Sequence, residues 1–457
     1  MNNNDLIKHI ESKYNVKSIK YKNLNVWLEL RNRIYTKIKF GEESAYKISN
    51  KTYISVLISM FYGFFKWFKK YDAWFFSNKV NRILIDGYYY DRIFDYIGSQ
   101  IDSSLFIELT TERHYKKSQV YSKNIVSKSL LIFIEKIVSI FVSLKRVDLT
   151  EYNKILKEFD VEISPVYGLK KMISQYYFMR FLLAFNKPKF VFISPSYDNY
   201  GYVKAFKEKG IKVIEVQHGV IIKEHYGYNV QTEFSRDYFV DYLLTFGENE
   251  KLVFNETNFG ISRESVIPVG NFYLDHILEY FKSVPKIENL KSKYTKSFVV
   301  SLQELEVPLR LIPLLIESAH LFPDYLFILK PRHKDMNYYT STYSLPSNMV
   351  VIENVNVYQL IMETDFHISV YSTCALEAPA LGKMNILYDI NGMAKSHLGE
   401  VLTNAKTTRY VSELDEFNLL IESLIPIDAK IVISEHKDVI EGNYKTNINN
   451  FLKQIND

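Results

Sequence analysis

The chain has 457 residues, which is long enough for two or three domains with large buried cores. Hydrophobic residues make up 47% and charged residues 24%, and the net charge of +5 is too small to indicate a nucleic-acid-binding protein. The single cysteine, Cys374, excludes a disulfide framework and any cysteine-based zinc site.

The first 70 residues predict a mainly helical segment. The chain begins without a basic-then-apolar signal sequence, so we expect a cytoplasmic protein. The run Tyr53–Phe68 is nearly apolar over 16 residues and is followed by Lys69 and Lys70. It is too short and too interrupted for a membrane span. It predicts either a buried helix or an aromatic face resting peripherally on the inner leaflet of the cell membrane.

From residue 72 short apolar runs alternate with helical stretches, a rhythm that indicates a parallel sheet covered by helices. We expect strands at Ala73–Ser77, Arg82–Ile85, Pro188–Ser196, Ile211–Val216, Asp241–Phe246 and Val266–Val269. We expect helices at Ser127–Ser143, Leu169–Ala184 and Tyr200–Lys209, with a short one from Glu248.

A second series of the same kind follows a polar, charged segment that lies between Gly270 and Lys296. Strands are expected at Ser297–Leu302, Tyr325–Lys330, Met349–Glu353, Asp365–Val370 and Met384–Ile390, and helices at Leu309–Leu321, Tyr358–Met362 and Cys374–Leu381. The sequence therefore predicts an α/β protein of two Rossmann-like, doubly wound domains facing a central cleft. The first is expected over residues 1–280, the second over 290–438, and a last helix within 439–457 is expected to pack back on the first.

Ligands of doubly wound sheets lie beyond the carboxyl ends of the strands. Gln217, His218 and Gly219 follow the strand 211–216 directly, so we expect them in the site. The residues expected to contact an acceptor are Gln217, Gly219, His225, Tyr226, Tyr228 and Asp198.

Two residues are candidates for the catalytic base. His218 either takes a proton from an acceptor hydroxyl, steadies charge on a leaving phosphate, or hydrogen-bonds the loop backbone. Asp86 closes a strand before Gly87 and is the second candidate. Asp91 and Asp95 are interpreted as charges on a helix surface.

In the second domain Lys330, Arg332 and His333 follow one strand, and Ser372 and Thr373 follow another where a helix opens. The first group is either a solvated basic loop or part of a nucleotide site. Hydroxyls at a helix start, with free N–H groups and the helix dipole, bind phosphate, although Thr373 is alternatively a simple helix cap. Glu377, within that helix, is a candidate acceptor for nucleoside hydroxyls. Gly270 and Gln303, at other strand ends, complete the donor-binding set.

Several motifs are absent. No two aspartates are separated by a single residue, so the metal-binding Asp-x-Asp motif is missing. No phosphate-binding, dinucleotide-binding, zinc-protease or serine-hydrolase motif occurs either. We therefore expect neither a metal nor another cofactor.

The segment from Asp241 to Asp275 resembles the end of the first domain of GT-B glycosyltransferases and nucleotide-sugar 2-epimerases, with Gly270 and Asn271 matching the family's Gly-Asn before the interdomain hinge. Lys330 and His333, together with the pair Ser372–Thr373, are similar to the loops that hold CMP in bacterial sialyl- and Kdo-transferases of capsule and lipopolysaccharide assembly. Here the histidine is followed by lysine rather than proline. The runs around Gln217 and upstream of Asp86 also look like capsule and O-antigen biosynthesis proteins.

The resemblance implies a metal-independent, inverting GT-B glycosyltransferase. Its partners would be a nucleotide-sugar donor, CMP-linked before UDP- or GDP-linked, and a glycan or lipid-linked glycan acceptor. Two alternatives stay open: transfer of a glycerol- or ribitol-phosphate from a CDP donor, and a non-catalytic nucleotide-sugar-binding subunit.

Overall fold

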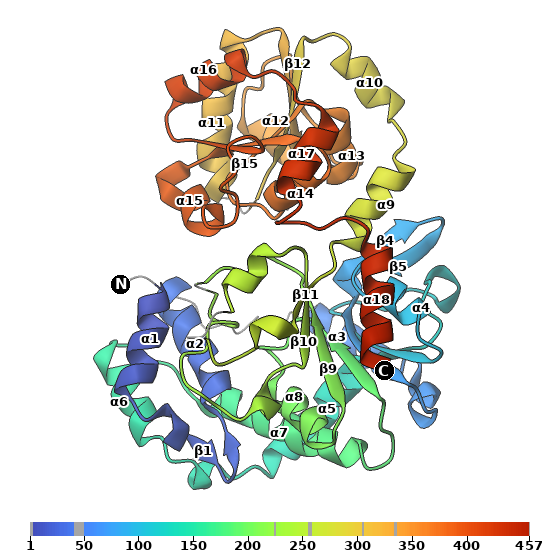
Figure 1. Ribbon diagram of the computed structural model, residues 1–457, viewed down its shortest axis with the longest axis vertical. Helices are drawn as coiled ribbons and strands as arrows, with labels where there is room; N and C mark the ends of the chain where they lie inside the picture. The colour runs from blue at the N-terminus through green and yellow to red at the C-terminus, as the bar shows by residue number, and fades with distance from the viewer. Residues whose placement is uncertain are drawn as a thin grey trace. The chain divides into compact units, whose positions relative to one another are not determined.

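The computed structural model divides the chain into two compact α/β units (Figure 1). The described residues are 3–40, 50–223, 225–254, 258–303, 306–332 and 336–456. Unit 1 comprises Met1–Thr245, Glu250–Pro268 and Lys445–Asp457, and unit 2 comprises Phe246–Asn249 and Val269–Tyr444.

Unit 1 is built on a seven-stranded parallel sheet with the order β11-β10-β9-β8-β3-β6-β7. Its strands are β3 (Ala73–Asn78), β6 (Ser104–Leu109), β7 (Ile125–Ser127), β8 (Phe190–Ile193), β9 (Lys212–Val216), β10 (Tyr242–Thr245) and β11 (Val266–Pro268). Counted in chain order within the unit, the first six strands follow the 3-2-1-4-5-6 arrangement of a Rossmann sheet. The predicted strands from Ala73 and from residues 188 to 269 are confirmed, whereas β6 and β7 were not predicted.

The central strand β3 is buried on both faces, as a parallel sheet requires. Trp74 and Phe76 pack against Phe206 of α8 (Tyr200–Glu208), with ring centroids 6.3 and 5.7 Å apart. Phe75 points to the opposite face, where its ring lies 5.7 Å from that of Phe94. The predicted helices α5 (Lys128–Ile140), α7 (Val166–Leu182) and α8 are confirmed and pack on one another.

The amino-terminal part of unit 1 is mainly helical. Its elements are α1 (Asn3–Lys13), β1 (Lys20–Tyr21), β2 (Leu24–Asn25), α2 (Trp27–Phe40), α3 (Asn50–Ser59) and the 3-10 helix η2 (Phe64–Phe68). The remaining helices of the unit are α4 (Asp95–Ser99), α6 (Thr150–Glu158) and α18 (Tyr444–Asn456). The last helix lies against the first sheet, because Phe451 packs on Tyr242 at 5.3 Å and Lys212 donates to the Ile455 carbonyl at 2.8 Å.

The interpretation of Tyr53–Phe68 as a buried helix is wrong for the side chains that the structure describes. Ile58, Phe61 and Phe65 expose 56%, 60% and 81% of their surface. None of the helices in the described part of the chain combines the length and apolar character needed to cross a bilayer.

The predicted strand β4 (Arg82–Ile85) forms, but not in the parallel sheet. It pairs antiparallel with β5 (Tyr88–Asp91) in a separate hairpin. Asp86 and Gly87 form the two-residue turn with φ of 48° and 82°, the Asp-Gly chemistry that such hairpins prefer. The strand-end rule that suggested Asp86 as a base therefore does not apply to it.

The expectation that Asp91 and Asp95 are surface charges is wrong. Their exposed fractions are 0% and 1%, and Asp95 lies 3.4 Å from the buried guanidinium of Arg82. Arg82 also pairs with Glu108, whose other oxygen lies 2.7 Å from the His114 ring. This buried charge network ties the hairpin to β6.

Unit 2 holds a six-stranded parallel sheet with the order β14-β13-β12-β15-β16-β17, again the Rossmann order. Its strands are β12 (Lys296–Ser301), β13 (Tyr325–Lys330), β14 (Met349–Val351), β15 (Phe366–Ser369), β16 (Met384–Tyr388) and β17 (Thr408–Val411). Its helices are α9 (Phe272–Tyr280), α10 (Pro285–Lys291), α11 (Glu306–Leu321), α12 (Met336–Thr342), α13 (Val357–Glu363), α14 (Cys374–Ala380), α15 (Met393–Leu398), α16 (Leu414–Ser423) and α17 (Ala429–His436). The predicted fold class, α/β with two doubly wound Rossmann-like sheets in one chain, is confirmed. The cleft stays a prediction.

Candidate functional site

Each sheet has one switch point, where the chain crosses from one side of its first strand to the other. In unit 1 it lies between β3 and β8, and in unit 2 between β12 and β15. Such crevices at the carboxyl ends of parallel strands are where doubly wound sheets bind ligands. The candidate site is therefore expected at the carboxyl ends of the strands at these two switch points.

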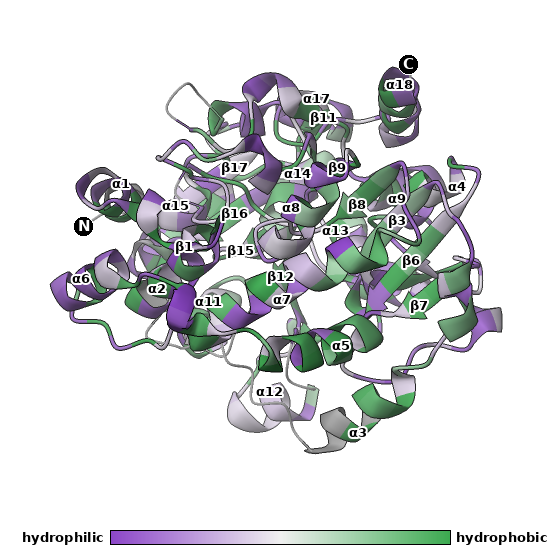
Figure 2. Cartoon of the chain, turned by 90° about the horizontal axis from the view of Figure 1, so that it is seen from below, coloured by the Kyte–Doolittle hydropathy of each residue, from purple (hydrophilic) through white to green (hydrophobic). Residues whose placement is uncertain are grey.

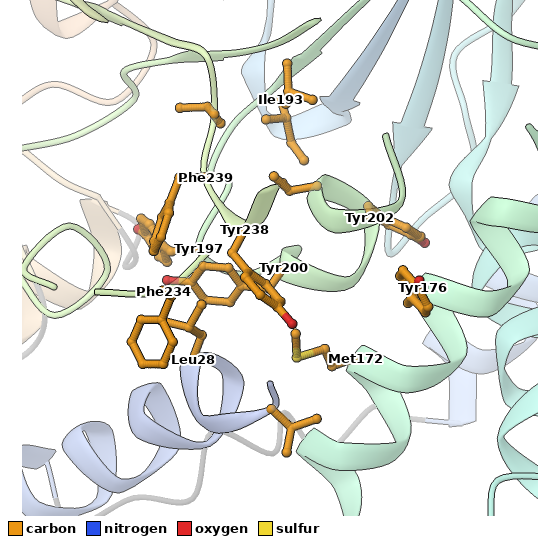
Figure 3. Close-up of a cluster of buried hydrophobic side chains, with 14 of the residues drawn as sticks. Leu28, Met172, Tyr176, Ile193, Tyr197, Tyr200, Tyr202, Phe234, Tyr238 and Phe239 are labelled. Atoms are coloured by element: carbon orange, nitrogen blue, oxygen red, sulfur yellow. The ribbon is translucent and has the colours of Figure 1, made fainter. Parts of the chain in front are cut away.

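Tyr197, after β8, is the centre of an aromatic cluster in unit 1. Its ring centroid lies 5.2 Å from that of His225, 5.7 Å from Tyr226 and 6.5 Å from His218. Tyr197 belongs, with Phe234 and Phe239, to the buried hydrophobic cluster drawn in Figure 3. The loops after β8 and β9 thus meet at one aromatic platform.

Helix α2 holds these loops in place. Arg31, which is 3% exposed, donates to the carbonyls of Asn229 at 2.9 Å and of Tyr226 at 2.6 Å, and pairs with Glu11 at 2.9 Å. Asn32 donates to the Tyr197 carbonyl at 3.0 Å. Because Arg31 and Asn32 are adjacent on one helix, α2 fixes both loops relative to each other.

His218 is exposed at the end of β9. Within the described residues its imidazole has no hydrogen-bond partner, so the interpretation of a histidine bonded to loop backbone is wrong there. Surrounding protein atoms lower the pKa of His218, and the nearby charge of Asp198 acts in the opposite direction. A neutral ring with open nitrogens is the form that accepts a proton.

Gln217 and Gly219 differ in what they do. Gln217 is 2% exposed, and its amide donates to the Gly219 carbonyl at 2.9 Å and to Glu250 at 2.8 Å, so it braces the loop. Gly219 has no left-handed φ, and a Cβ built there would meet no described atom within 4 Å. The protein itself therefore gives no steric reason for glycine at this position.

The three expected acceptor residues after Gly219 are not equally accessible. His225 and Tyr226 are partly exposed and stacked at 5.1 Å. Tyr228, expected to line the acceptor pocket, is only 4% exposed and donates to Glu215 at 2.7 Å. Burial raises the pKa of Glu215 to about 7, against the hydrogen bonds from Ser196 and Tyr228. Tyr228 and Glu215 are thus buried residues that support the loop carrying His225 and Tyr226.

Charged side chains gather near the unit 1 switch point. Lys171 of α7 pairs with Glu29 of α2 at 2.9 Å. The ammonium of Lys128, at the start of α5, lies 3.3 Å from the Asn199 amide oxygen and 5.5 Å from the Tyr202 ring centroid. Burial lowers the pKa of Lys128 to about 8, although the charge of Asp198 raises it. Asp198 is itself exposed and influences His218 and Tyr226 as well.

Gln303 bridges the switch point of unit 2. It follows β12, is 3% exposed, and its side-chain oxygen accepts from the backbone N–H of Tyr371 at 3.0 Å, after β15. Just below, Ser301 contacts the ring of His367 at 2.8 Å. Burial lowers the pKa of His367 to about 4, so this histidine is a neutral core residue. The bridge fixes two strand ends relative to each other.

The expected basic group after β13 is only partly described. Lys330 donates to the Glu353 carbonyl, and burial lowers its pKa. Arg332 is exposed. His333 lies outside the described residues. Of the three, Arg332 is the described cation that faces solvent.

The loop after β15 presents hydroxyls. The Ser372 hydroxyl accepts from the Cys374 N–H at 3.3 Å, whereas Thr373 is exposed and its side chain caps no backbone group. The alternative that Thr373 simply caps the helix is therefore wrong, and Ser372 takes that role. Glu377 is 7% exposed within α14. Gly270, with φ of 88°, has a packing reason, because a Cβ would lie 2.1 Å from the Glu441 carbonyl oxygen.

Among the described residues no group of three or more His, Cys, Asp or Glu side chains is placed to hold a metal ion. The expectation of a metal-independent protein stays a prediction.

No protein-family model matches the chain, and no curated protein matches it. Solved structures do. The UDP-GlcNAc 2-epimerase from Neisseria meningitidis bound to UDP-GlcNAc is similar at 14% identity over 84% of this chain and 99% of that chain, with a TM-score of 0.48. The calicheamicin glycosyltransferase CalG4 matches at 11% identity over 84% and 98%, with a TM-score of 0.49. The glycotransferase of kitacinnamycin matches at 13% over 66% and 89%, with a TM-score of 0.45. At these identities and TM-scores the likeness carries no argument about substrate or activity.

Sequence reasoning missed the residues that organise the site of unit 1. They are Arg31, Asn32, Lys128 and Glu215, whereas the strand-end rule had already placed Tyr197 at the end of its strand. Two of them had a signal: Glu215 interrupts an apolar strand, and Lys128 opens a helix directly after a short strand.

Proposed function

We propose that the protein is a glycosyltransferase that moves a sugar from a nucleotide-sugar donor to a glycan or lipid-linked glycan acceptor. The observation that carries the proposal is the duplication of the switch point. Each Rossmann-like unit presents an exposed polar side chain that forms no hydrogen bond within the described residues, at the carboxyl end of a strand that lies at the switch point or is the next strand along. These side chains are His218 in unit 1 and Thr373 in unit 2. A reaction between two substrates needs two such places.

The donor is assigned to unit 2. Thr373 and Ser372 would contact its phosphates, and Arg332 would supply positive charge to the leaving phosphate. Glu377 would accept hydrogen bonds from the ribose hydroxyls. His333 and Lys330 keep their proposed places in the same set. CMP-linked sugars are the first candidates, followed by UDP- and GDP-linked sugars.

The acceptor is assigned to unit 1, on the platform of His225 and Tyr226. In the proposed step the acceptor oxygen attacks the anomeric carbon as the bond from that carbon to the phosphate oxygen breaks. The hydroxyl proton passes to His218, and the nucleotide leaves with the bonding electron pair. The result is inversion at the anomeric carbon. Asp198 would stabilise the imidazolium that forms. Asp86 is the second candidate for the catalytic base, because its hairpin turn lies outside the seven-stranded sheet.

The test compares His218→Asn with His320→Gln, an exposed histidine on α11. Both variants are incubated with nucleotide-sugars and candidate glycan acceptors, and nucleotide release is measured. The proposal expects at least about a hundredfold loss for His218→Asn, the range of general base catalysis, and no loss for the control. Nucleotide binding should persist in both.

Three outcomes would contradict the proposal. Equal turnover in both variants would remove His218 from the chemistry. Release of CMP from CDP-glycerol or CDP-ribitol, with sugar donors inert, would favour polyol-phosphate transfer. Binding of nucleotide-sugars without turnover of any donor would favour a non-catalytic subunit.

A further inference from the structure

One surface of unit 1 has no role in the proposed reaction. Helices α3 and α5 pack against each other, and η2 packs against β7. Figure 2 shows α5 mostly in green, the colour of apolar residues. We call the surface formed by α3, η2 and α5 the apolar face.

The apolar face exposes large hydrophobic side chains at helical spacing. On α5 and directly after it, the exposed fractions run from 43% for Ile137 to 82% for Phe141. The others on this face that expose 44% or more are Ile54, Leu57, Ile58, Phe61, Phe65, Phe68, Phe133 and Ile140. Single exposed apolar residues are ordinary, but ten of them on neighbouring elements indicate an interaction surface.

The segments that carry the apolar face are strongly basic. Residues 50–71 and 113–147 contain twelve lysines and arginines and one acid, Glu135, whereas the whole chain has 57 basic and 52 acidic residues. Glu135 does not offset this charge at the surface, because it is 7% exposed and accepts from the Tyr202 hydroxyl. The charge of these segments is therefore mainly positive, with the acids Asp72, Glu112 and Asp148 directly at their ends.

The basic side chains border the apolar residues. Lys66 of η2 donates to the Lys123 carbonyl, and Lys117 lies 5.8 Å from the Tyr62 ring centroid. Burial lowers the pKa of Lys66, and the nearby charges of Lys117 and Lys69 lower it further. Like charges held together beside an apolar surface destabilise the free protein and are relieved by an anionic partner.

We propose that the apolar face docks on an anionic lipid surface, with the α3, η2 and α5 side chains in the acyl–headgroup boundary and the lysines on the headgroups. Aromatic and aliphatic side chains flanked by lysines are what an interfacial, non-spanning segment requires. A protein partner is disfavoured, because a lone basic patch around an apolar centre matches a headgroup layer without needing shape complementarity. This proposal rests on unit 1 alone and is independent of the reaction proposed above.

The test is flotation of the full chain with vesicles of phosphatidylcholine, with and without phosphatidylglycerol at roughly one part in three. The apolar variant is Phe133→Ser/Ile137→Ser/Ile140→Ser on α5, and its matched control is Leu419→Ser/Ile425→Ser/Ile431→Ser, three exposed apolar residues of unit 2. The charge variant is Lys69→Gln/Lys70→Gln. Thermal unfolding of each variant reports whether it folds.

The wild type and the unit 2 control should float with the anionic vesicles. The α5 variant should lose at least about tenfold in partition coefficient, and the charge variant about fivefold for each lysine neutralised. Equal binding to neutral vesicles, or equal loss in the control, would overturn the proposal. So would a dimer in sedimentation velocity that the α5 variant abolishes while vesicles stay unbound, because the apolar face would then belong to a second copy. If the α5 variant fails to fold, unchanged flotation of the charge variant alone would overturn it.

Discussion

Glu215 is the residue for which the structure makes the sharpest stability prediction. It is 0% exposed on β9, and burial raises its pKa from the ordinary 4.5 to about 7. The folded state therefore holds this proton more tightly than the unfolded state, so the free energy of unfolding falls as pH rises from about 4.5 to about 7. At 1.36 kcal/mol per pKa unit, the loss is about 3 kcal/mol. Glu215→Gln keeps an acceptor for the Tyr228 hydroxyl but does not titrate.

The measurement is amide hydrogen exchange of the β9 peptide in wild type and variant at pH 5 and pH 7.5, compared at each pH so that intrinsic exchange rates cancel. The wild type should lose about 2 kcal/mol of protection relative to the variant between the two values, because part of the change lies below pH 5. Glu208→Gln, which replaces an exposed carboxylate on α8, is the control and should show no such change. An unchanged difference between wild type and Glu215→Gln at the two pH values would refute the reasoning.

Three further substitutions have expected outcomes. Gly219→Ala should leave Tm unchanged, because its Cβ meets no described atom. It should nevertheless lower kcat/KM at least about tenfold by obstructing the ligand, and unchanged turnover would contradict this. Gly270→Ala should lower Tm, because its φ is 88° and the Cβ would lie 2.1 Å from a carbonyl oxygen; a Tm equal to that of the wild type would show that the backbone adapts. Arg82→Met should cost about 3–5 kcal/mol in urea unfolding, because it leaves Glu108 and Asp95 buried without their cation; a loss below about 1 kcal/mol would mean that they are protonated.

The fold was predictable because parallel strands are buried on both faces and therefore occur in the sequence as continuous apolar runs. The runs from Phe190 and from Phe298 needed no tertiary information. β7 was missed because it has only three residues, Ile125–Ser127, and continues without a break into α5. β4 was predicted as a strand, but its antiparallel pairing depends on the turn at Asp86 rather than on its own apolar pattern.

The site was less predictable, because function at a strand end depends on which side chains the rest of the fold has already engaged. His218 and Gln217 are adjacent in sequence, yet one is exposed and the other braces the loop through Glu250. Asp91 and Asp95 have the spacing of exposed helix charges, but the hairpin brings Arg82 beside Asp95, and Asp91 accepts hydrogen bonds from the backbone N–H groups of Ile93 and Phe94. Partners such as Arg82 and Glu250 come from elsewhere in the chain, so local spacing does not reveal them.

The central claim is that unit 2 binds the nucleotide of a sugar donor through the exposed hydroxyl of Thr373. The direct measurement is thermal unfolding of the wild type, Thr373→Val and Thr403→Val with CMP, CDP, UDP, GDP and dTDP. Thr403 is an exposed threonine of the same unit away from the switch point, so its variant controls for the loss of a hydroxyl. At about a hundred times its dissociation constant, a bound nucleotide should add about 2.7 kcal/mol of stability to the wild type and to Thr403→Val, and markedly less to Thr373→Val. No shift with any of the five nucleotides, or an equal shift in all three proteins, would contradict the account.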